Sequence, residues 1–308
     1  MTIPVSAVIP TRDRSTVLAK ALTDIMKQNV QFDEIIIVDS SSDDKTKYLC
    51  DEYNANSKWN IRYFKALEAG AATQRNQGVS ESTQPFICFM DDDVYLEDLC
   101  LERLWKGIST DPQVGGINAM ITNQKYIPLG KATRFICRII NGRSLASYAG
   151  KCIGPAYNFL PDDNEGLAEY VPVDWLNLGC TIYRREVLPA PPFPGNFKGY
   201  SMMEDLTLSL TVGKSRKLLN ARNARLYHDS QPGDYKQNIV LLEKMELVNR
   251  HFIMTKVLNR TAFSDYLKLF LLESFFIVSL ATSFKKIKRL PESIWGKLSG
   301  IKQIIFNV

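Results

Sequence analysis

The stretch PFICFMDDD, from Pro85 to Asp93, joins an apolar run long enough for a buried strand to three consecutive carboxylates. In an open α/β sheet, ligands bind at the edge formed by the carboxyl ends of the strands. Carboxylate oxygens placed there suit Mg²⁺ or Mn²⁺ holding a diphosphate. The alternative is an acidic helix N-terminus after the strand, which the helix dipole favours.

The residues before this stretch alternate between short apolar runs and helical periodicity. Val5–Ile9, Glu34–Val38 and Ile61–Phe64 have the composition of buried strands, while helix patterns follow from Ser15 and over Gly70–Ser82. Strands that alternate with helices predict right-handed βαβ units. We therefore expect an α/β fold, Rossmann-like, with a mostly parallel central sheet flanked by helices.

Polar residues follow three of the predicted strands at their carboxyl ends. Thr11 and Arg12 follow the first strand, Asp39 follows the second, and the three aspartates follow the strand that ends at Met90. Because these ends share one edge of a parallel sheet, we expect a single polar crevice there. Neither a G-x-x-x-x-G-K-[ST] nor a G-x-G-x-x-G motif occurs, which disfavours P-loop and standard dinucleotide-binding proteins.

Seven short motifs together resemble the family 2 glycosyltransferases with the GT-A fold. Each motif is weakly specific, but all seven occur in the family's order and cover roughly residues 1–230. This chain departs from the family at Gln74, where Ala is common, and at Leu178-Gly179, where Gly-Gly is common. The motifs are VIPTRDR (Val8–Arg14), IIIVDSSS (Ile35–Ser42), GAATQRNQG (Gly70–Gly78), FMDDDV (Phe89–Val94), VDWLNLGCTIYRREVL (Val173–Leu188), MEDLTLSL (Met203–Leu210) and ARLYHD (Ala224–Asp229).

The resemblance implies an inverting transferase of the bacterial surface-polysaccharide type, with a nucleotide-diphosphate sugar, UDP- or dTDP-linked, as donor. It implies that Asp39 accepts a hydrogen bond from the base, and that Arg12 and Arg75 contact the donor, including its phosphates. The alternatives are an Asx-turn at Asp39 and solvated surface arginines. The residues expected to bind the donor are Pro10, Thr11, Arg12, Asp39, Arg75, Asp91 and Asp92.

The same resemblance implies a Mn²⁺ or Mg²⁺ ion held by Asp93 and His228, with Asp91 facing the nucleoside. A divalent cation between two phosphates neutralises the charge that grows on the leaving group. The alternative for His228 is a half-buried histidine at a strand end. The other histidine, His251, lies within a helical pattern, and we expect it to be structural.

Inversion at the anomeric carbon requires one carboxylate that takes the proton of the acceptor hydroxyl. The resemblance assigns this role to Asp205 and places Glu204 in the acceptor pocket. Trp175 and Tyr200 are candidates for stacking on sugar rings. The alternatives are two acids at a helix N-terminus and two aromatic residues of the core.

Composition and length fit one large domain with an appendage. The chain has 308 residues, 45% of them hydrophobic, and a net charge of +5. Its six cysteines have no C-x-x-C spacing, and Met1 leads straight into a predicted strand, so we expect a reduced, cytoplasmic protein. We expect a nucleotide-sugar-binding and catalytic domain over 1–232, with a loop-rich insertion over Ile127–Gly166, and a helical region over 233–308.

The C-terminal region combines apolar and basic stretches. Tyr266–Phe284 is strongly apolar but contains Lys268 and Glu273, so we do not expect it to span a membrane. Basic residues next to an apolar face that bears Trp295 predict an interfacial helix and a peripheral position at the inner face of the cell membrane. The alternatives are packing on the catalytic domain and a homodimer interface. The basic residues are Lys285, Lys286, Lys288 and Arg289.

Three hypotheses follow for the function. The first is a sugar transferase that acts on a saccharide or lipid-linked saccharide acceptor. The second is a nucleotidyltransferase-like enzyme, whose expected glycines are missing from Pro10–Arg14, and the third is a non-catalytic membrane adaptor with a transferase fold. We expect no nucleic acid as a partner, because the basic residues are not interleaved with aromatic residues in a binding motif.

Overall fold

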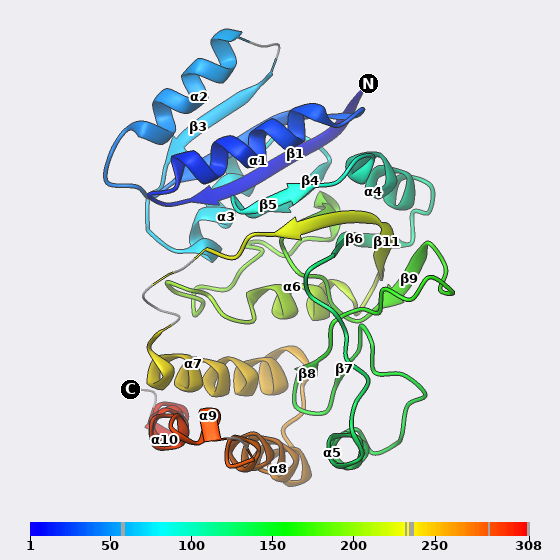
Figure 1. The fold of residues 1–308 in the computed structure, drawn as a ribbon, viewed down its shortest axis with the longest axis vertical. Coiled ribbons are helices and arrows are strands. Elements are labelled where there is room, and N and C mark those ends of the chain that lie inside the picture. The colour runs from blue at the N-terminus through cyan, green and yellow to red at the C-terminus, as the bar shows by residue number, and fades with distance from the viewer. Residues whose placement is uncertain (57–58, 232, 234–236, 283, 307–308) are drawn as a thin grey trace. The chain divides into compact units, whose positions relative to one another are not determined.

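The computed structural model describes residues 1–56, 59–231, 233, 237–282 and 284–306. The chain divides into two compact units (Figure 1). The first unit contains residues 1–125 and 160–231, and the second contains residues 126–159 and 232–308.

The first unit is built on a nine-stranded sheet in the order β3-β2-β1-β4-β10-β6-β11-β5, with β9 paired to β11. The expected mostly parallel sheet is confirmed, because six strands run in one direction and three run against them. The six are β1 (Thr2–Thr11), β2 (Gln31–Asp39), β3 (Ile61–Lys65), β4 (Phe86–Met90), β6 (Val114–Ile121) and β11 (Lys217–His228). The three are β5 (Val94–Leu96), β9 (Tyr170–Val173) and β10 (Cys180–Arg184).

The register of the central strands brings their polar ends together. Thr11 at the end of β1 pairs with Asp39 at the end of β2, and Val8 of β1 pairs with Phe89 of β4. The strands before these ends are continuous apolar runs because helices cover the sheet, as parallel sheets require. The carboxyl ends of β1, β2 and β4 therefore meet at the edge of the sheet where the polar crevice was expected.

In the described part of the first unit, five α-helices connect the strands and supply the rest of the core. The helix α3 approaches β1 so closely that a β-carbon at Gly78 would lie 2.3 Å from Cγ1 of Val8. This contact fixes the face of α3 that carries Arg75, a buried residue of the same helix. The helices are α1 (Ser15–Lys27), α2 (Lys45–Asn56), α3 (Ala71–Glu81), α4 (Cys100–Ser109) and α6 (Glu204–Val212), with the short 3-10 turn η1 at Arg185–Val187.

The second unit is mainly helical (Figure 1). Cys137 and Ile140 of α5 cluster with Tyr148, Ile153 and Leu272, which draws residues 126–159 into this unit. The sequence pattern did not indicate this grouping. The expected boundary between a catalytic domain over 1–232 and a helical region over 233–308 stays a prediction. The elements are α5 (Lys131–Asn141), β7 (Cys152–Ile153), β8 (Tyr157–Asn158), α7 (Ile239–Phe252), the π-turn η3 (Ile253–Val257), α8 (Phe263–Leu280), α9 (Phe284–Ile287) and α10 (Leu290–Phe306).

The insertion over Ile127–Gly166, expected to be rich in loops, also contains the helix α5, which the sequence pattern did not indicate. This helix exposes Phe135 and Ile139 while it buries Cys137 and Ile140. Its apolar residues do recur at helical spacing, but the helix is short and lies between Gly130 and Gly142 in a stretch rich in glycine and proline. None of the described helices has the length and apolar character needed to cross a membrane.

Candidate active site

The aspartate triplet lies between the end of β4 and the C-terminal end of β11. The backbone N–H of Asp91 donates to the carbonyl of Gly179 (3.2 Å), and the N–H of Asp229 donates to the carbonyl of Asp93 (2.8 Å). The short strand β5 pairs Val94 with His228. Residues from distant parts of the chain are thereby held side by side, which places His228 beside the triplet.

Three side chains at this point form a group able to hold a metal ion. One ligand atom each of Asp91, Asp93 and His228 lies within 4.8 Å of the others. His228 Nε2 is 3.2 Å from Asp93 Oδ1, and its Nδ1 is 3.2 Å from Gln124 Nε2. Two carboxylate oxygens and one imidazole nitrogen fit Mn²⁺, and the oxygens alone fit Mg²⁺. The structure thus brings the expected ligands together and adds Asp91 to them.

Asp92 points elsewhere and is held by β1 and the residues after it. Thr11 donates its hydroxyl to Asp92 Oδ2 (2.6 Å), and Arg14 Nη1 lies 3.3 Å from Asp92 Oδ1 and 3.6 Å from Asp93 Oδ2. Burial raises the pKa of Asp92 to about 6, although Thr11 and Arg14 oppose the shift. Burial acts in the same direction on Asp93, but its hydrogen bond with His228 leaves its pKa below the ordinary value.

Arg14 is a site residue that the sequence pattern did not single out. It is the last residue of the motif that begins at Val8, two positions after Arg12, and the motif alone does not tell which arginine turns inward. The Arg12 side chain is 68% exposed and lies 3.5 Å from Asp13, whereas the Arg14 side chain is 28% exposed and faces two aspartates. The structure thus places Arg14, not Arg12, against the carboxylates.

Arg75 is buried between two carboxylates from distant parts of the chain. Its Nη2 lies 2.6 Å from Asp91 Oδ1, and its Nη1 pairs closely with Glu204 Oε1. Both charges favour the guanidinium, so its pKa stays above the ordinary value despite burial. Arg75 therefore links the end of β4 to the start of α6, and its expected contact with the donor stays a prediction.

Asp205 follows Glu204 in the first turn of α6. Its Oδ1 accepts a hydrogen bond from the N–H of Leu206 (2.7 Å). Burial raises the pKa of Asp205 to about 6, the charge of Asp91 adds to the shift, and Arg75 opposes it. Burial also raises the pKa of Glu204. A carboxylate with a pKa near neutral is a better proton acceptor than an ordinary aspartate.

The turn before α6 is hydrogen-bonded to the start of α3. The N–H of Ala71 donates to the carbonyl of Gly199 (3.3 Å), and the N–H of Ala72 donates to Ser201 Oγ (3.3 Å). Ser201 and Met203 both have positive φ angles, 55° and 68°. Strained backbone of this kind persists where the surroundings hold it, and here it presents the start of α6 to the carboxylate cluster.

Asp39 is fully buried at the end of β2. Its Oδ1 accepts from the backbone N–H of Ser41 (2.8 Å), and its Oδ2 accepts from Tyr63 Oη (3.2 Å). The Asx-turn weighed as an alternative is therefore present. Gln74, one of the departures from the family pattern, donates to the carbonyls of Thr11 (3.0 Å) and Val38 (2.7 Å) and so ties β1 to β2 beside Asp39.

The remaining candidates differ in exposure. Trp175 is buried, which fits its interpretation as a core aromatic residue, whereas Tyr200 is exposed. Pro10 is partly buried at the end of β1, where it pairs with Val38 of β2. None of the roles assigned to these residues follows from position alone, and each remains a prediction.

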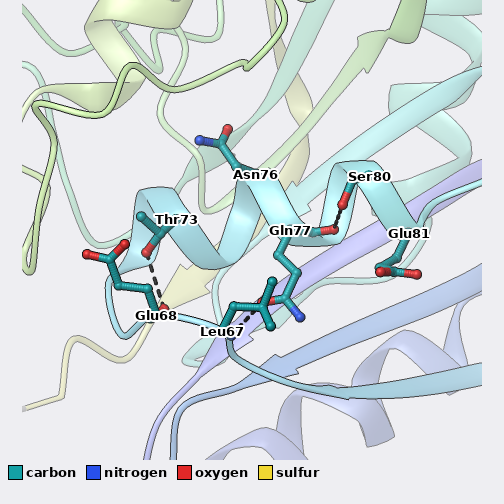
Figure 2. Close-up of a pocket in the computed structure, with 7 residues that line it drawn as sticks. All are labelled: Leu67, Glu68, Thr73, Asn76, Gln77, Ser80 and Glu81. Atoms are coloured by element: carbon teal, nitrogen blue, oxygen red, sulfur yellow. Dashed lines mark hydrogen bonds between the residues drawn. The ribbon is translucent and has the colours of Figure 1, made fainter.

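A separate hollow of about 340 Å³ lies along α3, as Figure 2 shows. It contains none of the predicted site residues, since Arg75 lies on the buried face of the helix. Its two acidic side chains make it a poor place for a diphosphate. The lining residues are Leu67, Glu68, Thr73, Asn76, Gln77, Ser80 and Glu81.

Comparison with known proteins matches residues 6–188 to the model of the family described as "Glycosyl transferase family 2". Among curated proteins, the chain is similar to the GalNAc(5)-diNAcBac-PP-undecaprenol beta-1,3-glucosyltransferase of Campylobacter jejuni. The two are 31% identical over 90 residues, which are 29% of this chain and 29% of that protein. The matched stretches span between 11% and 35% of the length of the curated relatives.

Two solved structures share the fold at low sequence identity. The mannosyltransferase PcManGT from Pyrobaculum calidifontis, in complex with GDP-Man and Mn²⁺, has a TM-score of 0.59 and 12% identity, over 99% of this chain and 87% of that chain. S. aureus TarS 1-349, in complex with UDP-GlcNAc, has a TM-score of 0.57 and 14% identity, over 96% of this chain and 79% of that chain.

Proposed function

The chain belongs to glycosyl transferase family 2, and from this premise we propose that it transfers a sugar, with inversion, from a nucleotide-diphosphate sugar to an acceptor hydroxyl. The GT-A fold expected from the motifs is confirmed by the sheet and by the two structural neighbours. The family match favours this activity over nucleotidyl transfer. The observation that carries the proposal is the grouping of Asp91, Asp93 and His228 at the edge where β1, β2 and β4 end.

In the proposed reaction, Asp205 accepts the proton of the acceptor hydroxyl. The hydroxyl oxygen then forms a bond to the anomeric carbon, while the bond from that carbon to the β-phosphate oxygen breaks and the nucleoside diphosphate leaves. The raised pKa of Asp205 supports this role, because a proton acceptor works best when its pKa approaches the working pH. Arg75 holds Glu204 beside Asp205 and thereby shapes the place of the acceptor.

Asp91, Asp93 and His228 are the residues that would hold the divalent cation. When bound, the cation supplies positive charge to the diphosphate as it leaves. The structural neighbour PcManGT is a complex with Mn²⁺, which supports a divalent metal. We extend the proposal to Mg²⁺ because carboxylate oxygens also suit that ion.

We propose UDP- or dTDP-linked sugars as donors, bound through Asp39, Arg12 and the residues around Thr11. The two structural neighbours are complexes with GDP-Man and with UDP-GlcNAc, so the base is the first property to test. For the acceptor, the relative from C. jejuni supports a lipid-linked saccharide or polysaccharide intermediate. Such an acceptor would place the enzyme at the inner face of the cell membrane.

The proposal is tested with a panel of UDP-, dTDP- and GDP-sugars, scored by release of the nucleoside diphosphate with Mn²⁺ present. We expect release from one donor by the unchanged protein, and loss of release with normal donor binding in Asp205→Asn, which keeps the size of the side chain and lowers its proton affinity. Release by Asp205→Asn at the unchanged rate would remove Asp205 from the reaction.

A further inference from the structure

The helix α10 carries its apolar residues on the outside. Its buried positions are small or charged: Ser293, Gly296, Lys297 and Gly300. A β-carbon at Gly296 would lie 2.7 Å from the carbonyl oxygen of Val240, so glycine is what lets α10 approach α7. A helix that covers a core in water has the reverse distribution, with the apolar stripe inward and the polar face outward.

Charged side chains occupy the space between α7, α8 and α10. Lys297 Nζ lies 2.9 Å from Glu243, 3.1 Å from Glu246 and 2.7 Å from Glu273. Arg250 Nε lies 2.9 Å from Glu273, and its Nη2 also pairs with Glu246. If Lys297 turned outward, Glu243, Glu246 and Glu273 would each lose a cation, and Arg250 alone would remain for Glu246 and Glu273. The network therefore fixes which side of α10 faces inward, and with it the apolar side that faces outward.

The exposed apolar residues of α8 and α10 form what we call the outer face. On α10 they recur at helical spacing along one side, and Trp295 is 64% exposed. On α8, Phe263 is 78% and Phe270 71% exposed. Large exposed apolar patches mark interaction sites. The outer face consists of Phe263, Tyr266, Leu267, Phe270 and Val278 of α8 and Ile294, Trp295, Leu298, Ile301, Ile305 and Phe306 of α10.

Basic side chains accompany the apolar ones in this unit. Lys286, Lys288 and Arg289 are exposed just before α10, and the side chain of Lys285 lies outside the described part of the chain. On α5, Lys131, Arg134 and Arg138 are exposed beside Phe135 and Ile139. Among the described residues, no carboxylate forms an ion pair with these six basic side chains.

We propose that the outer face docks on an anionic lipid bilayer, with its apolar side chains among the upper acyl chains and the neighbouring basic residues at the headgroups. No described helix is able to cross a membrane, so α8 and α10 would lie in the plane of the surface. Trp and Tyr side chains favour this depth, and basic residues favour anionic headgroups. The inference deepens the proposed location of the enzyme, but it does not depend on the sugar chemistry.

A second copy of the chain is the competing occupant. In a twofold dimer the same patch meets itself, which would bring the basic residues of one copy towards those of the other. Like charges brought together in this way oppose association, whereas phosphate headgroups neutralise them. The charge of the unit therefore favours lipid.

The test uses the full chain and vesicles of phosphatidylglycerol and phosphatidylcholine in equal parts, compared with phosphatidylcholine alone. The variant Trp295→Gln/Ile305→Gln removes two exposed apolar side chains of the outer face. The control Tyr48→Gln/Leu67→Gln removes two similarly exposed ones from the first unit. We expect co-sedimentation of the unchanged protein and the control with the anionic vesicles, and partitioning about tenfold weaker for the outer-face variant.

Two further measurements make the test decisive even if the variant folds poorly. Tryptophan fluorescence of the unchanged protein should be quenched by brominated acyl chains, and high salt should weaken the binding. No vesicle binding by the unchanged protein, or equal binding by both variants, would overturn the proposal. So would a dimer in light scattering that becomes a monomer in the outer-face variant. Failure of the sugar-transfer proposal would instead appear as absent nucleoside diphosphate release with vesicle binding intact.

Discussion

A single guanidinium joins the two halves of the candidate site. Arg75 pairs with Asp91, which follows β4, and with Glu204, which begins α6. Asp205, the proposed proton acceptor, is the next residue along the chain. The distance between the cation ligands and the proton acceptor is therefore set by one buried side chain, and a change at this residue separates a structural role from a direct contact with the donor.

For Arg75→Lys we expect a large fall in turnover, a loss of stability of about 1–3 kcal/mol, and weaker donor binding, because Arg75 is predicted to contact the donor. Lysine keeps the charge but lacks the fork that reaches both carboxylates, so one of them loses its buried partner. Denaturant unfolding, calorimetry with the nucleoside diphosphate, and turnover measure the three quantities. If stability falls while donor affinity is unchanged, Arg75 acts only through the two carboxylates and does not contact the donor.

Asp93→Ala should remove the part of nucleoside diphosphate affinity that depends on Mn²⁺, about tenfold or more, while the fold survives. The physical reason is the loss of one of two carboxylates in the group that includes His228. Calorimetric titrations with Mn²⁺ and with a chelator measure the difference. Asp51→Ala, an exposed acid on α2, is the control. Metal-dependent affinity that persists in Asp93→Ala would contradict the assignment.

The pKa of Asp205 predicts the acid limb of the pH profile. A proton acceptor must be ionised, so turnover should fall about tenfold per pH unit below about 6, well above the range expected of an ordinary aspartate. The effect on stability has the opposite sign. Folding raises the pKa of Asp205, so its ionisation lowers the free energy of unfolding as the pH rises from the pKa of Asp205 in the unfolded chain through about 6. A fall in turnover that begins only near pH 4, as for an ordinary aspartate, would contradict the raised pKa of Asp205.

At the scale of elements, the contact of α3 with β1 positions Arg75. We expect Gly78→Ala to cost about 1–3 kcal/mol and to lower turnover, because the new β-carbon would meet Val8 at 2.3 Å in the centre of the sheet. The gain in helix propensity, about 1 kcal/mol, is smaller than this clash.

The matched change is Gly195→Ala, where no atom outside the neighbouring residues lies within 4 Å of the added carbon. There we expect a change within about 0.5 kcal/mol. Thermal and denaturant unfolding of both variants, together with turnover, provide the comparison. Equal stability of the two would mean that α3 shifts freely on β1, which would contradict the close packing of Gly78 against Val8.

The strands and helices of the first unit were largely predictable from sequence, for a physical reason. Buried parallel strands are short apolar runs, and β1, β2, β3 and β4 begin or end within a few residues of the predicted bounds. The position of the aspartates after β4 followed directly. The helix α5 was missed although its apolar residues recur at helical spacing, because it has only 11 residues and is surrounded by glycines and prolines that indicate loops.

Side-chain pairing in the site was not predictable, because it depends on long-range geometry. No sequence pattern sets the distance between residues 75 and 204, and the buried Arg75–Glu204 pair appears only when the turn before α6 is fastened to α3. The choice between Arg12 and Arg14 likewise depends on how the chain turns after β1. The grouping of His228 with Asp93 was the exception, because the motif order of the family already implied it.

At the scale of the whole chain, two units of different character are combined. The first has an apolar core and a polar edge, whereas in the second α10 buries Lys297 against carboxylates and exposes its apolar residues. The net charge of +5 agrees with an anionic surface as the partner of the second unit. We therefore propose that the first unit performs the chemistry and that the second brings it to a lipid-linked acceptor.

The most direct test of the central claim is the anomeric configuration of the sugar at the moment of its release. Water replaces the unknown acceptor, and proton NMR follows hydrolysis of an α-linked nucleotide sugar faster than the anomers interconvert. We expect that the β-anomer appears first, and that Asp205→Asn releases neither anomer. Initial release of the α-anomer would contradict direct displacement assisted by Asp205.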